Sequence, residues 1–199
     1  VGTVIQIAVE TKEGDIFDKD YMETLKQISD ETFFLPGVNR ISLESLWTPN
    51  IRWSEVTEEG FEGGPVIPNA YDGSPEKLAE LRENVLRSGR VGSLVADNFK
   101  STIVQATLFD TDPDSGVPLD YHAFSKELEA KIREKYQNDN IQIHVIGVAK
   151  LIGDLTDAGP QIAMFFVYAF VISFVLLIWY TRCILSTMNL LVCAVISVI

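Results

Sequence analysis

Few residues in this sequence could take part in catalysis or bind a metal. His122 and His144 are the only histidines, and no Ser-His-Asp spacing, HExxH motif or paired-histidine pattern links either to a nucleophile or a second ligand. We expect the first to lie on a helix beside Tyr121 and the second on the solvent-exposed side of a strand. Both cysteines, Cys183 and Cys193, lie in an apolar segment, so we expect no disulfide framework and no thiolate metal site before residue 160.

Two segments partly match known ligand loops. Residues 110–116 begin like a calcium loop, but the glycine falls one place late at Gly116 and the twelfth position is Tyr121 instead of Glu. Gly60–Gly64 follows no strong strand, opens no helix, and carries Glu where a phosphate would bind. We expect the first to be a loop turn with exposed carboxylates, and we do not expect the second to bind phosphate. The sequence therefore predicts no catalytic, cofactor-binding or metal-binding residue, identifies no substrate-binding residue, and favours a protein that is not an enzyme.

The most informative stretch is apolar. Residues 162–180 contain no charged residue, and about 20 apolar residues in a helix cross a bilayer core of about 30 Å. Trp179 and Tyr180 suit the membrane interface, and Arg182 follows them. We expect Asp157 to cap this helix and Pro160 to occupy its first turn. Asp154 is also interpreted as a capping residue, with a coupling or gating role as the alternative for both aspartates.

Residues 183–199 are again uncharged and predict the start of a second transmembrane helix, truncated by the end of the sequence. Arg182 in the intervening turn favours a cytoplasmic turn, which places residues 1–160 on the other side of the membrane. We expect an export signal or another span before Val1. Polar groups in the two segments are expected to bond between helices. They are Tyr168, Ser173, Ser186, Thr187, Asn189 and Ser197.

The charge balance limits the possible partners. The chain has 16 Lys and Arg against 28 Asp and Glu, a net charge of −12. Because Arg182 is the only charged residue after residue 160, the preceding part carries −13. Such an acidic domain is not expected to bind nucleic acid or anionic lipid head groups.

The elements expected before residue 160 form two similar sets. Residues 3–9 and 101–109 predict strands, residues 18–34 and 119–137 predict helices, and the alternating segments 41–44 and 141–148 predict strands with one wet face. Thr3-Val4-Ile5-Gln6 resembles Thr102-Ile103-Val104-Gln105, although four residues can match by chance. Two strand–helix–strand units predict an α+β, ferredoxin-like (split βαβ) domain.

The predicted organisation has four parts. Residues 1–153 form the α+β domain, in which 48–100 are an elaboration between the two units, with a short strand at 51–56, a helix at 74–87 and a short strand at 94–96. Residues 154–161 form a connector, 162–180 the first transmembrane helix and 183–199 the second.

This layout resembles the resistance–nodulation–division (RND) superfamily, and within it the branch of predicted exporters and lipid-type transporters. The resemblance is carried by a βαβ-repeat domain joined through Gly153–Pro160 to an aromatic-rich span and a tight turn. It implies a multi-pass permease of the inner (cell) membrane of a bacterium, with residues 1–160 on the periplasmic side and residues 1–153 as a porter-like domain. It further implies proton-driven transport of hydrophobic or amphiphilic substrates, and a homo-oligomer is a possible assembly. The proton-relay aspartate of the family belongs to a later span, so no functional residue is carried over.

A second class of function is compatible with the same layout. The outer domain could bind a ligand or protein and the spans could carry a signal, as in a membrane-anchored receptor. A hydrolase on a membrane anchor is a third interpretation, but no catalytic constellation supports it.

Overall fold

The computed structural model describes residues 3–58, 60–111, 116–182 and 188–189. The chain forms two compact units, Val1–Asp154 and Leu155–Ile199. In chain order the elements are β1 (Thr3–Thr11), α1 (Lys19–Phe34), the 3-10 turn η1 (Arg40–Ser42), β2 (Arg52–Thr57), β3 (Gly60–Pro65), α2 (Pro75–Arg87), β4 (Ser101–Leu108), α3 (Tyr121–Leu128), the π-helical segment η2 (Glu129–Arg133), α4 (Glu134–Tyr136), β5 (Ile141–Gly147) and α5 (Val148–Thr181). The first unit is therefore a mixed α+β structure, as predicted.

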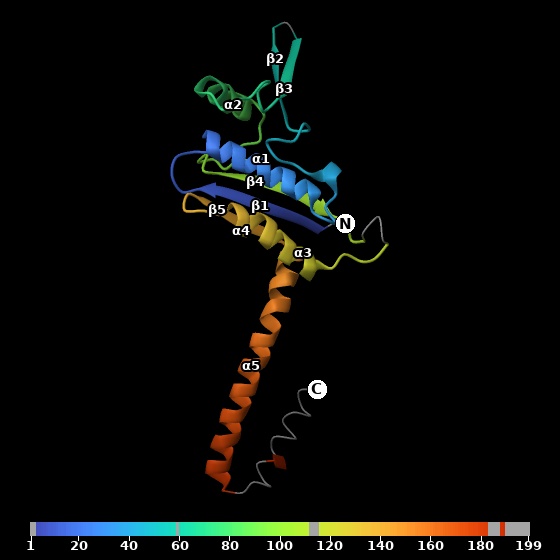
Figure 1. Cartoon of the computed structure of the whole chain (residues 1–199), viewed down its shortest axis with the longest axis vertical. Coiled ribbons are helices and arrows are strands. Elements are labelled where there is room, and N and C mark those ends of the chain that lie inside the picture. Colours follow the sequence, from blue (N-terminus) through green and yellow to red (C-terminus); the bar gives the residue numbers. More distant parts are fainter. Residues whose placement is uncertain (1–2, 59, 112–115, 183–187, 190–199) are drawn as a thin grey trace. The chain divides into compact units, whose positions relative to one another are not determined.

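A three-stranded antiparallel sheet forms the centre of the first unit. Its strand order is β4-β1-β5 (Figure 1), with Ile7 opposite Val104 and Val9 opposite Ile143. The strand predicted over residues 3–9 is confirmed as β1, which lies at the centre of this sheet. Alternate side chains of β1 are buried, among them Ile5, so one face of the sheet is covered and the other is partly open.

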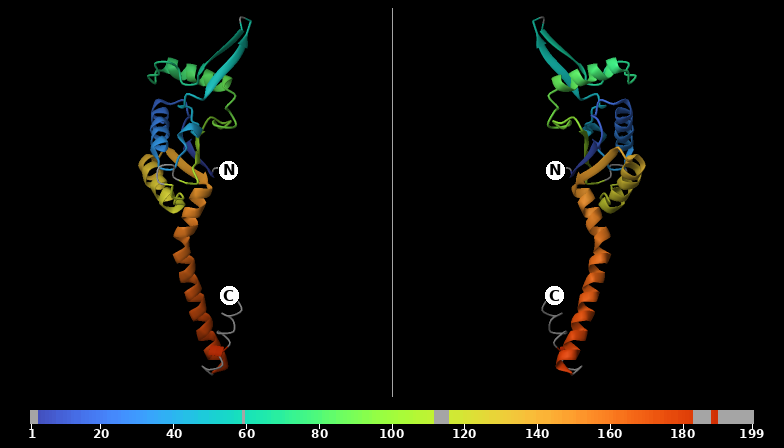
Figure 2. Two further views of the ribbon diagram at one scale, coloured as in Figure 1. Left: turned by 90° about the vertical axis from the view of Figure 1, so that its right-hand side faces the viewer. Right: turned by 90° about the vertical axis from the view of Figure 1, so that its left-hand side faces the viewer.

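Two helices cover the buried face of this sheet. Helix α1 and the segment α3–η2–α4 lie on the same side of the strands (Figure 2). Each begins at an aspartate that caps it: Asp18 accepts from the N–H groups of Asp20 and Tyr21 at 3.0 and 3.2 Å, and Asp120 does the same for the first turn of α3. The side chains that these helices bury are Tyr21, Met22, Leu25, Ile28, Phe124, Leu128 and Ile132.

The strand predicted over residues 41–44 is wrong. Asn39 accepts from the N–H of Ile41 at 3.2 Å and caps the turn η1 instead. Only single antiparallel bridges join this part of the chain to β4, at Val38 with Leu108 and at Glu44 with Gln105. The alternation was misleading because Ile41 faces solvent and is 91% exposed. The short strand predicted at 94–96 is likewise limited to isolated bridges.

The segment between the two halves contains a hairpin and a helix. The short strand predicted over 51–56 is confirmed as β2. The helix predicted over 74–87 is confirmed as α2, which begins after Ser74, whose hydroxyl accepts from the N–H of Lys77. Residues Gly60–Gly64, for which the sequence predicted no element, form β3 and pair with β2. Glycine permits this pairing: a Cβ on Gly63 would lie 2.8 Å from the carbonyl oxygen of Trp53.

Helix α5 begins earlier than expected. It starts at Val148, directly after β5, so Asp157 and Pro160 lie inside the helix instead of capping it or occupying its first turn. Residues 154–161 are helical throughout. The helix is long and apolar enough to cross a membrane, and none of its apolar window is buried. It ends at Thr181, after which Arg182 adopts a left-handed backbone conformation with φ of 50°. The predicted second span lies outside the described residues except for Met188 and Asn189.

Candidate coupling site at the start of helix α5

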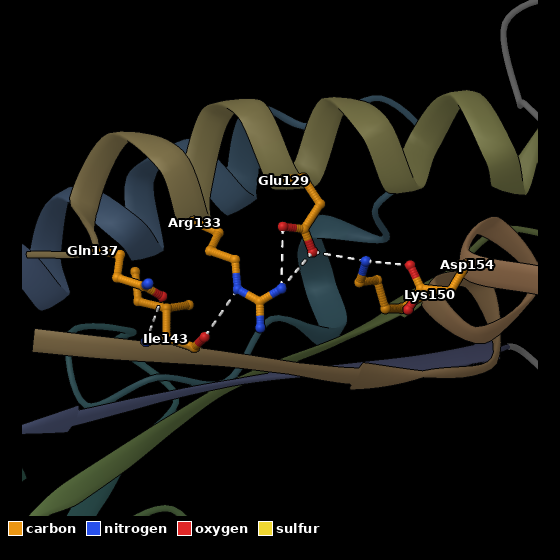
Figure 3. Close-up of polar contacts among 6 residues, drawn as sticks. All are labelled: Glu129, Arg133, Gln137, Ile143, Lys150 and Asp154. Carbon is orange, nitrogen blue, oxygen red and sulfur yellow. Dashed lines mark hydrogen bonds and ion pairs between the residues drawn. The ribbon is translucent and has the colours of Figure 1, made fainter. Parts of the chain in front are cut away.

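A network of charged side chains lies where β5 leads into α5. Glu129 is its centre (Figure 3). The guanidinium of Arg133 donates from Nη1 to both carboxylate oxygens at 3.2 Å, and the ammonium of Lys150 lies 2.8 Å from Oε1. Lys150 also donates to Asp154, one turn further along α5, at 2.5 Å. The network therefore joins the π-helical segment to the first two turns of α5.

The same network also contacts the backbone of β5. Arg133 Nε donates to the carbonyl oxygen of Ile143 at 3.2 Å, and the Ile143 N–H donates to the side-chain oxygen of Gln137 at 3.5 Å. Figure 3 shows these side chains reaching from the helix to the strand. Arg133 thus ties the helix to the sheet on one side and to Glu129 on the other.

The ion pair between Lys150 and Glu129 is more buried than the ion pairs along α1 and α2. The Lys150 side chain is 14% exposed and that of Glu129 is 23% exposed, whereas in most i,i+4 pairs of α1 and α2 both partners are far more open. Coulomb attraction is less screened away from water, and an ammonium left without its partner there is costly. Losing either side chain should therefore destabilise the attachment of α5 more than losing a surface pair.

A close contact between backbones supports the network. A Cβ on Gly153 would lie 2.4 Å from Cβ and Oγ of Ser125, so glycine is required for α5 to approach α3 this closely. At the start of the helix, Gly147 has φ of +154°, and a Cβ there would lie 2.8 Å from the carbonyl oxygen of Val4. The turn from β5 into α5 is thus fixed by two glycines and one charge network.

The π-helical segment gives this region an unusual geometry. It carries both Glu129 and Arg133 and keeps Ile132 buried in the core. Single π turns within helices are rare and occur frequently at functional sites. After it, α4 is held to α1 by Lys135, whose ammonium donates to Glu31. This hydrogen bond lowers the pKa of the Glu31 carboxyl below its ordinary value and raises that of Lys135.

The residues considered for chemistry lie elsewhere. His122 is in the first turn of α3 and His144 is on β5, 3.4 Å from a carboxylate oxygen of Glu10. Both sit on the kind of element expected of them. Among the described residues, no group of three or more His, Cys, Asp or Glu could hold a metal ion. The calcium-like segment has residues 112–115 outside the described part of the chain.

A hollow with acidic residues in its lining lies beside the start of α1. It has a volume of about 640 Å³. Asp18 caps α1, and Asp15 accepts from the Phe17 N–H and pairs with Arg82 at 3.2 Å. Because these carboxylates have partners within the chain, the hollow offers them no evident role in binding a cation.

The capping role expected of Asp154 is wrong. It lies inside α5 and pairs with Lys150, and the coupling or gating role weighed as the alternative stays a prediction. The sequence interpretation missed Glu129, Arg133 and Lys150. The i,i+4 spacings 129/133 and 150/154 were visible signals, but nothing local indicated that the two pairs would meet.

The comparisons with known proteins add no identity. No protein-family model matches the chain. No curated protein matches its sequence. The features of the chain that bear on function are therefore the geometry at the start of α5 and the apolar helix that follows.

Proposed function

We propose that this chain is part of an RND-type permease of a bacterial inner membrane, in which the α+β unit is a periplasmic porter-like domain and α5 couples it to the membrane. The observation that carries the proposal is the continuity of α5. One helix starts within the charge network of the α+β unit at Val148 and continues without a break through the apolar residues 162–180. A helix held in this way can pass a movement of the outer domain to the span, or the reverse.

The sheet supports a ferredoxin-like, split-βαβ assignment. The segment 38–44 bridges β4 on the edge away from β1, so the order from edge to edge is 38–44, β4, β1, β5. Both neighbours of β1 run antiparallel to it, and the two helices cover one face. In this proposal 38–44 is the second strand of the fold, reduced to single bridges by the turn at η1.

The remaining parts of the proposal follow from the resemblance. Residues 183–199 begin a second span, so that the chain forms a transmembrane hairpin of a multi-pass protein. The transported substrates are hydrophobic or amphiphilic, transport is driven by the proton gradient, and the α+β unit forms part of the substrate path without acting as an enzyme. We propose no substrate-binding residue.

Transport by reconstituted protein tests the coupling role. The protein is placed in liposomes, a pH gradient is imposed, and the movement of a fluorescent amphiphile is followed. Glu129→Gln should slow transport several-fold while the amount of inserted protein stays the same. The matched control is Glu127→Gln, because Glu127 lies on the same helix and pairs with Lys131 on the surface. Equal transport by the two variants would show that the network has no coupling role.

Thiol labelling tests the proposed orientation in the membrane and, together with the transport assay, distinguishes a permease from a receptor. In a protein without its native cysteines, Ser54→Cys should react with a membrane-impermeant maleimide in spheroplasts, whereas Arg182→Cys should react only after the membrane is permeabilised. The reverse pattern would contradict the proposed orientation. A receptor would show the same labelling but no transport of any amphiphile, so the two experiments together distinguish a permease from a sensory domain.

A further inference from the structure

The hairpin β2–β3 is exposed on both faces. None of its described residues is buried, and Figure 1 shows it extending beyond helix α2. Val56 and Phe61 face each other across the two strands and are 73% and 87% exposed. An isolated two-stranded hairpin is marginally stable in water, and large exposed apolar side chains commonly mark protein contacts.

Helix α2 contacts strand β2 and holds the hairpin in place, while the apolar side chains nearer the turn stay exposed. Arg87 of α2 pairs with Glu55 at 3.2 Å and lies over the ring of Trp53, 5.4 Å from its centre. A Cβ on Gly64 would lie only 3.2 Å from the indole nitrogen of Trp53, which shows how closely β3 packs against that ring. The hairpin is therefore fixed by contacts with α2, and Val56 and Phe61 are exposed.

An apolar groove lies elsewhere on the same unit. It has a volume of about 370 Å³. Ile41, the most exposed of the large apolar side chains, lies on its rim, and Phe33 lies beside it under the guanidinium of Arg40 at 5.4 Å. Leu43 and Trp47 form further parts of its lining. A groove of this size and lining suits one aromatic and one aliphatic side chain.

The charges of the hairpin and the groove are complementary. Besides its apolar pair, the hairpin carries Glu55, Glu58, Glu59 and Glu62 against one cation, Arg52. The groove has Arg40 on its lining and Lys26 over the ring of Trp47 at 5.9 Å; the acid in the groove, Asp30, lies 3.8 Å from Lys26. The chain as a whole is strongly negative, but the cations at this groove would not repel the negatively charged hairpin.

We propose that the hairpin of one copy docks into the groove of a second copy of this chain, with Phe61 and Val56 against Phe33, Ile41 and Trp47. Because the two contacting surfaces differ, the contact is head-to-tail and generates a ring where the rotation closes. The inference goes beyond the transport proposal. It needs only the α+β unit, so it would stand if the protein were a receptor.

Cross-linking between differently tagged copies tests this contact. Both copies lack the native cysteines; one carries Phe61→Cys and the other Ile41→Cys, and they are expressed together. A short bis-maleimide applied to the membranes should yield a dimer with both tags. The matched control replaces Ile41→Cys by Leu86→Cys, an exposed apolar position on α2 outside the hairpin and the groove.

The cross-linking yields of the two cysteine pairs test the proposed contact. The Phe61–Ile41 pair should cross-link several-fold more than the Phe61–Leu86 pair. Equal yields, or no dimer in either case, would overturn the proposal. A dimer formed mainly between two Phe61→Cys copies would also overturn it, since it would show contact between like surfaces.

Self-association of variants gives a second, independent measurement. Phe61→Ser and Ile41→Ser should each weaken association by roughly tenfold or more, as expected for apolar residues at the centre of a contact. The double variant should be no weaker than either single one, because both remove the same contact. Energy transfer between dye-labelled copies on dilution in lipid measures this, with near-UV circular dichroism as the check of fold. Wild-type association by a folded Phe61→Ser variant would refute the docking model.

Discussion

Gly153→Ala should loosen the attachment of α5, although alanine normally favours a helix. In an exposed helix interior this change stabilises by about 1 kcal/mol. Here the new Cβ would lie 2.4 Å from Cβ and Oγ of Ser125, whereas carbon atoms in contact are about 3.5–4.0 Å apart. The Ser125 Cβ is fixed to the backbone and cannot rotate away, so α3 and α5 must separate. Overpacking of this kind costs up to about 3 kcal/mol, which leaves a net loss of about 2 kcal/mol.

Thermal unfolding in detergent measures this loss. With Trp53 and Trp179 replaced by phenylalanine, fluorescence of Trp47 reports on the α+β unit. A loss of about 2 kcal/mol should lower Tm by about 4–8 °C for a unit of this size. Gly159→Ala in the same helix is the control, because no atom lies within 4 Å of its added Cβ; it should leave Tm unchanged or raise it.

Second-site changes at Ser125 separate overpacking from other causes. Ser125→Gly should restore part of the stability of Gly153→Ala, since it removes the Cβ that causes the clash. Ser125→Ala should restore little, because it keeps that Cβ. If Gly153→Ala proved as stable as Gly159→Ala, the close approach of the two helices would be refuted.

Three further predictions concern other parts of the α+β unit. Burial raises the pKa of Tyr21 despite its hydrogen bond with a threonine. The neutral phenol therefore contributes its full stabilisation below about pH 10, and the free energy of unfolding falls by about 1.4 kcal/mol per pH unit above that pH. Tyr21→Phe should remove this slope in urea titrations at pH 8 and pH 11; an unchanged slope would contradict the assignment. Glu129→Gln and Lys150→Met should show a coupling of about 1–2 kcal/mol in a double-mutant cycle by urea unfolding, between the values for exposed and buried pairs, and additive effects would argue against the pair. Gly63→Ala should speed amide hydrogen exchange across the hairpin by roughly fivefold, a loss of about 1 kcal/mol, because its Cβ would meet the Trp53 carbonyl; unchanged exchange would show that the pairing is looser than described.

The elements that could be predicted from the sequence are those with local signals. The β-rich composition of residues 3–9 and 101–109 and the helical patterns of residues 18–34, 74–87 and 119–137 were sufficient to predict the strands and helices that position the site. Each of these patterns reflects contacts within a few residues, which sequence reasoning can evaluate.

The elements that were missed depend on contacts between distant residues. Gly60–Gly64 looks like a loop because glycine disfavours strands, yet pairing with β2 makes it a strand. The turn η1 forms where a strand was predicted because the side chain of Asn39 accepts a hydrogen bond from the nearby N–H of Ile41. The start of α5 was placed too late because Lys150 and Gly153 acquire their roles only from Glu129 and Ser125.

The contacts of Arg133 and Gln137 with Ile143 have a consequence for the behaviour of this domain at high local concentration. β5 pairs with β1 on one side only, and an unpaired strand edge is a template on which other chains can add strands and aggregate. Here the outward-facing carbonyl and N–H of Ile143 are already taken by the two side chains. The same charge network that anchors α5 thus covers this edge at Ile143, where a strand from another copy could pair only after both of these hydrogen bonds had broken.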